Sequence, residues 1–369
     1  MKKIIYLALV AASMFILVQS CKKSDSGSNN TDNNTGFDRK AMLTNISTNI
    51  IIPSYTAYQA STVSLDAAVT TFNATPNATN LTALQNAFIA AYKLWQSASE
   101  FNFGPAADAN LGVNTNTYPA DLTQINTNIN SGTYNPQLLA NLAAKGLPTL
   151  DYLLFGTGAD NTAILAQFTS DSKAANRKTY LAALSAELKT NMTTVLNAWN
   201  NSYKTTFVNS TGTNASSSTS YLINQFIYDY ELLKNYEIGV PAGSQSMGTT
   251  FPAKVQAYYS KISLQLAVLH TTALQNLYLG GSGSGLDDYL VAANAKYNGG
   301  SLNDAIKAQF TTSLTKLNTL TDPLSANIIS NSTAVLATYT ELQKLTVLLK
   351  TDMTSALGIL ITYGDNDGD

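Results

Sequence analysis

Cysteine and histidine are almost absent from this sequence, which contains one residue of each, Cys21 and His270, in 369. A disulfide within the chain needs two cysteines and a thiolate metal cluster needs several, so both are excluded. A metal site built from several histidines is excluded for the same reason. Because Cys21 has another predicted role, described below, an ordinary Cys–His pair is excluded as well.

Charged residues are also scarce, at 12% of the chain, which is about half of the roughly 25% that is usual in soluble domains. Asn, Thr and Ser take their place, so we expect a polar surface with few charges. The formal net charge is -2, and no run of Lys or Arg follows the first three residues. These features argue against a nucleic-acid partner.

The N-terminus has the pattern of an export signal. Lys2 and Lys3 precede an apolar run over residues 4–18, which is shorter than the roughly 20 residues that span a bilayer. The sequence LVQSC, ending at Cys21, resembles a lipobox, and that resemblance implies cleavage before Cys21 and acylation of this residue. A transmembrane anchor is the alternative interpretation.

We therefore predict a signal peptide over residues 1–20 and a lipidated cysteine with a flexible tether over residues 21–37. The tether is rich in Ser, Asn and Gly and has little apolar area to bury. Lys22, rather than Asp, follows the cysteine, which in Gram-negative lipoproteins indicates sorting to the outer membrane. The predicted partner is thus the membrane, reached through Cys21, with the protein facing either the periplasm or the outside.

Helical periodicity dominates from residue 38 onward, and alternating strand patterns are scarce, so we predict an all-α fold. Pro53 is expected to kink or restart the first helix, and Asn80 is expected to cap the second. The low-complexity stretch 208–220 is the predicted linker between two packed helical bundles, 38–207 and 221–369, although a long loop within one bundle would look similar. The apolar stripes cover residues 43–50, 81–95, 181–199, 255–277 and 342–360.

Five segments, in this order, resemble the imelysin family of exported helical proteins, which are classed as metallopeptidases and linked to iron uptake. Each motif alone is weak, but their order across the chain identifies a divergent member of the family. The segments are WQSASEFNFGP (95–105), YPAD (118–121), GLPTLDYLLFG (146–156), ELLKNYEIGVP (231–241) continuing into VQAYYSKIS (255–263), and the tail from residue 351.

The third segment departs from the family pattern Gly-x-His-x-x-Glu. Gly146 is kept, but Pro148 stands in place of the histidine and Asp151 in place of the glutamate. A histidine and a glutamate three residues apart share a helix face and can hold one metal ion, whereas proline offers no side-chain ligand. We therefore expect family-type metal chemistry to be lost, and Asp151 and Glu100 are the remaining candidate ligands for iron or another divalent cation.

Several carboxylates have both a functional and a structural interpretation. Glu100, among aromatic residues, is either a buried ligand with a raised pKa or a solvated residue at a helix end. Asp151 is either a ligand or a first-turn residue that complements the helix dipole. Asp121 is either a ligand or a helix cap, and capping is favoured.

The resemblance places Glu100, Asp121, Asp151 and the segment with Tyr258 and Ser260 near a cleft between the two bundles, where Tyr258 and Ser260 are candidates to bind a ligand. Ser260 has no neighbouring base in the sequence, and we predict no catalytic residue. His270 lies at the edge of an apolar stripe and is expected to be a packed or surface residue. The acidic tail 365–369 resembles the start of a Ca²⁺ loop but ends before the glutamate that such a loop needs.

These observations predict an envelope-anchored, non-catalytic binding protein linked to the uptake of iron or another nutrient. An imelysin-type metallopeptidase is the first alternative, because the family resemblance implies it. It is not preferred, because the metal motif that such a peptidase would need is altered. A surface module that binds or adheres to envelope proteins through its Asn- and Thr-rich surface is the second.

Overall fold

The computed structural model describes residues 36–364, and these residues belong to one compact unit. The predicted signal peptide, Cys21, residues 21–35 of the tether and the acidic tail 365–369 lie outside the described residues. Between residues 36 and 364 no helix is long and apolar enough to cross a membrane. The division into two bundles at residues 208–220 stays a prediction.

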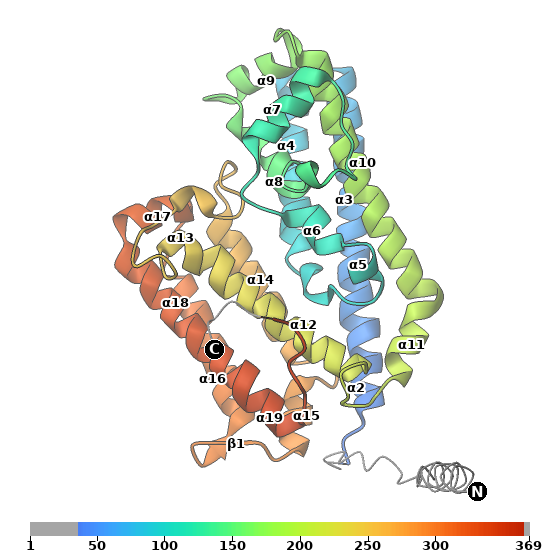
Figure 1. The fold of residues 1–369 in the computed structure, drawn as a ribbon, viewed down its shortest axis with the longest axis vertical. Helices are drawn as coiled ribbons and strands as arrows, with labels where there is room; N and C mark the ends of the chain where they lie inside the picture. The colour runs from blue at the N-terminus through green and yellow to red at the C-terminus, as the bar shows by residue number, and fades with distance from the viewer. Residues whose placement is uncertain (1–35, 365–369) are drawn as a thin grey trace, which may run out of the picture. The chain divides into compact units, whose positions relative to one another are not determined.

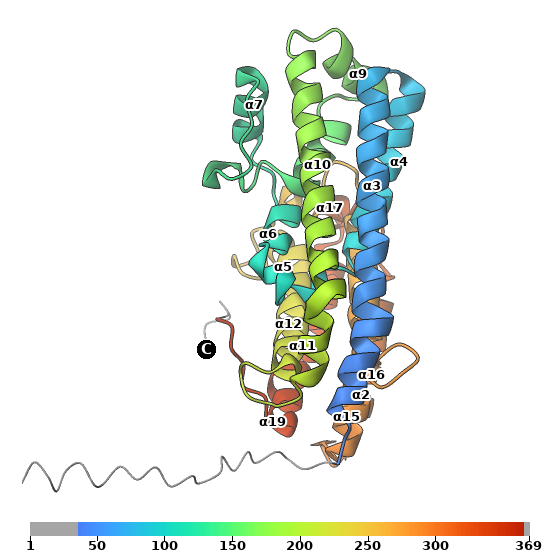
Figure 2. The ribbon, with the colours of Figure 1, turned by 90° about the vertical axis from the view of Figure 1, so that its right-hand side faces the viewer.

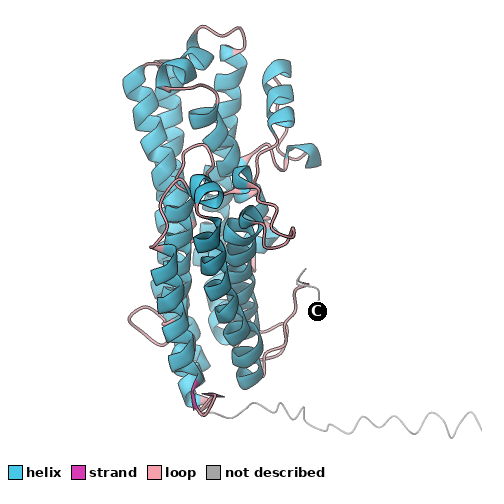
Figure 3. Cartoon of the chain, turned by 90° about the vertical axis from the view of Figure 1, so that its left-hand side faces the viewer, coloured by secondary structure: helices cyan, strands magenta, loops and turns pink. Residues whose placement is uncertain are grey.

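The described chain is helical almost throughout, as predicted (Figure 3). Three long helices, α3, α4 and α10, pack side by side in the first half (Figures 1 and 2). The elements of this half are α2 (Arg39–Ile46), η1 (Ser47–Ile51), α3 (Ile52–Ala74), α4 (Ala78–Trp95), η2 (Ser99–Phe101), α5 (Pro105–Asp108), α6 (Leu111–Asn116), α7 (Leu122–Ser131), η3 (Leu139–Asn141), α8 (Gly146–Asp151), η4 (Tyr152–Gly156), α9 (Asn161–Thr169), α10 (Ala174–Ala198), η5 (Trp199–Tyr203) and α11 (Lys204–Asn209).

In the second half, α16 packs against both α14 and α18. Two very short strands pair antiparallel just before α16. The elements are α12 (Ser218–Leu232), η6 (Leu233–Gly239), α13 (Val240–Ala242), η7 (Pro252–Lys254), α14 (Ser263–Tyr278), α15 (Leu286–Ala292), β1 (Lys296–Tyr297), β2 (Gly300–Ser301), α16 (Leu302–Leu317), α17 (Leu324–Ser330), α18 (Ser332–Val347), η8 (Leu348–Met353) and α19 (Thr354–Leu357).

Short polar side chains begin several of the helices. The prediction that Asn80 caps the second helix is wrong, because Asn77 is the cap residue of α4 and its side chain accepts the backbone N–H of Asn80. Asn80 already lies inside the first turn, so its own backbone N–H is one of the groups that need a cap, and its side-chain amide donates to the carbonyl of Thr75 instead. Pro53 lies in the first turn of α3, directly after the π-helical segment η1, and the residues on both sides of this junction keep right-handed helical dihedrals, so the helix continues through it.

The apolar stripe 255–277 is only partly helical. Helix α14 begins at Ser263, and residues 255–262 form turns in which Ala257 and Lys261 have positive φ. The prediction of one helix across this range is wrong, because the apolar spacing continues into a segment whose backbone leaves the helical region. This segment presents backbone N–H groups to the rest of the chain, which matters for Asp151 below.

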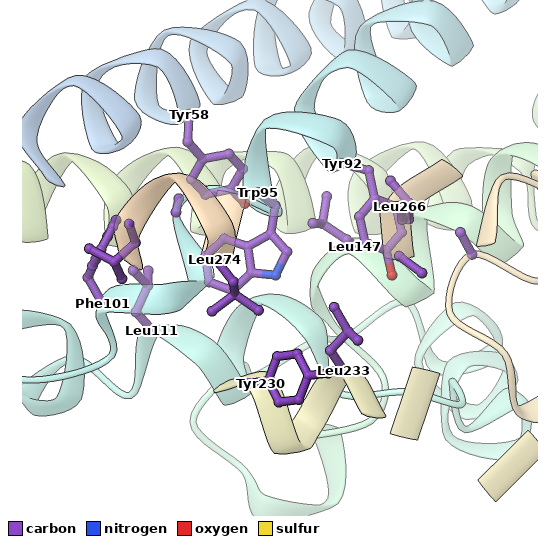
Figure 4. Packing of buried hydrophobic residues seen from close by; sticks show 14 of the residues in the cluster. Tyr58, Tyr92, Trp95, Phe101, Leu111, Leu147, Tyr230, Leu233, Leu266 and Leu274 are labelled. Carbon is purple, nitrogen blue, oxygen red and sulfur yellow. The ribbon is translucent and has the colours of Figure 1, made fainter. Parts of the chain in front are cut away.

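Buried side chains of both halves form one continuous hydrophobic cluster. Figure 4 shows Tyr58, Trp95 and Leu147 from the first half near Tyr230 and Leu274 from the second. A 3₁₀ turn, η2, follows α4 and packs against α12. The end of α4 and the adjoining turn are therefore fixed against the second half, where they help to form the pocket described next.

Candidate functional site

The only histidine of the chain lies between two carboxylates inside the protein. His270, on α14, places its Nε2 atom 2.7 Å from Asp229 Oδ2 and its Nδ1 atom 2.8 Å from Glu237 Oε1. Asp229 lies on α12 and Glu237 on the π-helical segment η6 that continues it. All three residues are buried, so one helix supplies both carboxylates and a second supplies the imidazole between them.

The two carboxylates keep this imidazole charged. Burial alone lowers the pKa of His270, but the charges of Asp229 and Glu237 and the hydrogen bonds to both offset that effect and raise it well above its usual value. The resulting imidazolium donates to one carboxylate from each nitrogen. Ser99 Oγ, from η2, donates to Asp229 Oδ2 at 3.3 Å. The cluster is thus an ion-pair network shared by both halves of the chain.

Glu100 lies next to this network and is also buried. Burial, together with the charge of Asp229, raises the pKa of Glu100 well above its usual value, while His270 acts in the opposite direction. Burial thus favours the uncharged form of Glu100 more than it would for an exposed glutamate. Beside it, the two carboxylates of Asp229 and Glu237 face one imidazole.

A pocket of about 310 Å³ opens beside the network. Residues near the end of α4 and around α6 form one wall, and residues of α12, η6 and α14 form the other. Asp229, Glu237 and His270 all face this pocket, and neither Lys nor Arg lines it. Four aromatic side chains contribute to the lining, namely Trp95, Tyr118, Tyr228 and Tyr236.

Two polar atoms at the pocket are acceptors with no donor. Within residues 36–364, Glu237 Oε2 and Asn102 Oδ1 are buried and have no hydrogen-bond partner. Glu237 and Asn102 line the pocket. Burial of an acceptor without a donor costs about 1–3 kcal/mol, so these atoms favour a ligand that supplies hydrogen-bond donors.

Asp151 binds a different part of the chain. Its Oδ2 accepts the backbone N–H of Tyr259 at 2.8 Å, and its Oδ1 accepts that of Ser260 at 2.9 Å. Burial raises the pKa of Asp151 to about 6, against the lowering effect of these hydrogen bonds. The turn that it holds contains the positive φ angles of Ala257 and Lys261, each of which costs of order 1–3 kcal/mol. Asp151 therefore stabilises a strained turn.

A family model described as Imelysin, and labelled as a peptidase family, matches residues 51–350. The chain belongs to the imelysin family. None of the curated proteins matches it.

Two solved structures share the fold. One is from Parabacteroides distasonis and is proposed to be the precursor of an iron-regulated protein A, with 18% identity and a TM-score of 0.71, covering 90% of this chain and 97% of that one. The other is an imelysin-like protein from Psychrobacter arcticum, with 20% identity and a TM-score of 0.67, covering 88% of this chain and 97% of that one.

The altered imelysin motif does not fit a metal ion. Pro148 has no donor atom, and both oxygens of Asp151 accept backbone N–H groups. His270 is no substitute, because both of its ring nitrogens face carboxylates and neither offers a free lone pair. Across residues 36–364 no group of three or more His, Cys, Asp or Glu side chains is arranged to hold a metal.

The remaining predicted site residues lie apart from the pocket of this imelysin-family chain. Asp121 is exposed and caps α7 by accepting the backbone N–H of Gln124. Tyr258 is exposed beside the turn that Asp151 holds. Ser260 belongs to that turn, where its backbone N–H donates to Asp151 and its hydroxyl donates to the carbonyl of Ala257. The structure therefore brings Asp151 and Ser260 together, and separately brings Glu100 to the His270 network.

Asp151 is the sixth residue of α8, which begins at Gly146. The interpretation of Asp151 as a first-turn residue that complements the helix dipole is therefore wrong. Gly146 has a positive φ and therefore lies outside the right-handed helical region, yet even if the helical turns are counted from Leu147, Asp151 lies beyond the first turn. The carboxylate instead acts through a contact with a turn more than a hundred residues away.

Asp229 and Glu237 were not predicted as site residues. Their spacing of eight residues corresponds to about two helical turns, which places two carboxylates on one face of a helix. Such a pair of acids on one helix face can hold a cation between them, and His270 on α14 is the group that the structure places there.

Proposed function

We propose that this imelysin-family chain is a non-catalytic binding protein, anchored to the bacterial outer membrane through Cys21, that holds a small ligand in the pocket beside His270. The observation that carries the proposal is the pocket itself. It combines a buried network of Asp229, Glu237 and His270 with aromatic walls and with acceptors that lack donors. Such a combination of apolar lining and a few directed polar groups is typical of small-ligand sites.

The geometry of the altered motif supports a binding role over peptidase chemistry. A metallopeptidase needs a metal ion and a base that activates water. Asp151 is committed to two backbone N–H groups, and Pro148 supplies no ligand. The proposed role in the uptake of iron or another nutrient follows from the family and from the description of the Parabacteroides distasonis protein as iron-regulated.

Calorimetric melting of the full chain, with and without the dialysable small-molecule fraction of a cell extract, tests the proposal. A ligand that binds only the folded state raises the melting temperature. Val113 lines the pocket and is 47% exposed, whereas Val347 is 49% exposed and lies outside the pocket. We expect the extract to stabilise the wild type and the Val347→Trp variant, but not the Val113→Trp variant, whose indole blocks the pocket.

Two results would contradict the proposal. The first is an extract that leaves the wild-type melting temperature unchanged, or that stabilises Val113→Trp as much as Val347→Trp. The second is proteolysis of a protein substrate that a chelator abolishes and that Asp151→Asn reduces. The second result would establish the metallopeptidase alternative instead.

A further inference from the structure

The wall of the pocket holds more acidic than basic side chains. Asp229 and Glu237 both face a single imidazole, that of His270. No Lys or Arg side chain lines the pocket. A ligand that enters this space therefore meets two carboxylates that share one imidazole, at short range, where water is partly excluded and charge interactions are strong.

The free hydrogen-bonding capacity of the pocket consists of acceptors. Glu237 is 5% exposed, and its Oε1 faces His270 while its Oε2 has no partner within the described chain. Asn102 Oδ1 is in the same situation. An anion or a ligand rich in acceptors would add repulsion here, whereas a group with several N–H donors would satisfy both atoms.

The remaining walls suit a cation with an apolar body. Trp95, Tyr118, Tyr228 and Tyr236 present aromatic surface to the pocket. The faces of Trp and Tyr rings attract an ammonium or guanidinium group through their quadrupoles, and they also cover apolar carbon. The volume of about 310 Å³ lies at the lower end of the range of roughly 300–1,000 Å³ for small-molecule sites.

We propose that the pocket binds a small organic cation, an ammonium or guanidinium compound with an apolar body, whose N–H groups bind Glu237 Oε2 and Asn102 Oδ1. This inference rests on the proposed function, because it names the class of ligand that the pocket holds. Residues 36–364 offer no donor set for a metal ion, whereas an organic cation needs only acceptors and aromatic surface.

Isothermal titration of the full chain with matched probes tests the inference. The probes are 2-phenylethylammonium and 2-phenylethylguanidinium, the neutral 2-phenylethanol, the anionic 3-phenylpropanoate, and Ca²⁺ as an inorganic cation. Because a charge-assisted hydrogen bond is about twice as strong as a neutral one, we expect the two organic cations to bind at least about tenfold more tightly than the alcohol. We expect no binding of the carboxylate.

Matched variants locate the binding in the pocket. Tyr236 lines the pocket and is 46% exposed, whereas Tyr297 is 38% exposed in the hairpin far from it in sequence and outside the lining. A cation–π contact of about 0.5–1 kcal/mol corresponds to an affinity ratio of about two to five. We expect Tyr236→Leu to weaken binding of the ammonium probe by that factor, and Tyr236→Phe and Tyr297→Leu to leave it unchanged.

The outcomes separate this inference from the proposed function. The organic-cation inference is wrong, and the binding function stands, in any of three cases. The alcohol or the carboxylate binds as tightly as the cations, or Ca²⁺ displaces the ammonium probe. In the third case neither organic cation binds, although the extract still stabilises the protein. If the extract also fails to stabilise the wild type, both fail. Equal losses in Tyr236→Leu and Tyr297→Leu would likewise overturn the placement in this pocket.

Discussion

Replacement of His270 by leucine removes the imidazole that lies between two buried carboxylates. Asp229 and Glu237 each lie within 2.8 Å of the imidazole and are almost fully buried. Breaking a buried ion pair by deleting one partner costs about 3–5 kcal/mol, and here one deletion leaves two carboxylates without their cation. We expect His270→Leu to lower the free energy of unfolding by at least that range, a large part of a typical total of about 5–15 kcal/mol.

The loss should depend on pH with a definite sign. The raised pKa of His270 means that its stabilising effect is fully present below about 6.5, its value in the unfolded chain. In the variant, the two carboxyl groups have lost their cation, and burial then favours their protonated forms in the folded state. Folding of the variant therefore takes up protons. Because protons become scarcer as pH rises, the free energy of unfolding of the variant falls from about pH 4.5 to 6.5. The difference between wild type and variant should therefore be smaller at pH 4.5 than at pH 6.5.

Urea unfolding at both pH values measures this difference. Thr272→Leu, on the exposed side of the same helix, is the control and should stay within about 0.5 kcal/mol of the wild type. The triple variant Asp229→Asn/Glu237→Gln/His270→Leu, which removes every charge, should recover part of the loss. A loss below about 1 kcal/mol in His270→Leu, or one that does not grow with pH, would refute the reasoning.

Three further predictions follow from particular residues. Burial raises the pKa of Glu100 in the folded state, so the contribution of this carboxyl group to stability falls as pH rises above about 4.5. Glu100→Gln should therefore gain stability relative to wild type between pH 4.5 and 8 in urea unfolding, and a difference that stays constant with pH would contradict the raised pKa. Gly146 has a positive φ, and Gly146→Ala places a Cβ 2.2 Å from the carbonyl oxygen of Thr115, so this change should lower the free energy of unfolding by more than about 2 kcal/mol. Gly299 also has a positive φ but lies in open space, so Gly299→Ala should cost about 1 kcal/mol. Similar losses in the two variants would contradict the contact with Thr115 as the cause. Asp121→Ala removes the cap of α7 and should lower the free energy of unfolding by about 1 kcal/mol, and no change would show that the cap is dispensable.

The helices that follow from local pattern were predictable. The stripe over residues 81–95 corresponds to α4, and the stripe over 181–199 to α10 and the start of η5, because burial of one helix face is a property of spacing within the sequence. Family resemblance also follows from the order of five motifs along the chain. The prediction failed where the backbone leaves the helix, as at residues 255–262, because apolar spacing does not report φ.

The site was only partly predictable because its contacts join distant residues. Glu100 was selected for its aromatic neighbours, and it does lie in the buried network. His270 was expected to be a packed or surface residue, and its two partners could not be foreseen, since Asp229 and Glu237 are more than thirty positions away in sequence. Asp151 was selected through a motif, but its contact with the turn at Tyr259 and Ser260 depends on tertiary packing that no local pattern encodes.

Native mass spectrometry of the full chain, purified from producing cells without added ligand, shows directly whether the protein carries an organic molecule or a metal, with Asp151→Ala as the control. We expect the wild type to carry a small organic molecule at one per chain, the control to carry it too, and neither to carry stoichiometric metal. A wild type with one iron or zinc ion per chain, lost in Asp151→Ala, would show instead that the altered imelysin motif still binds metal.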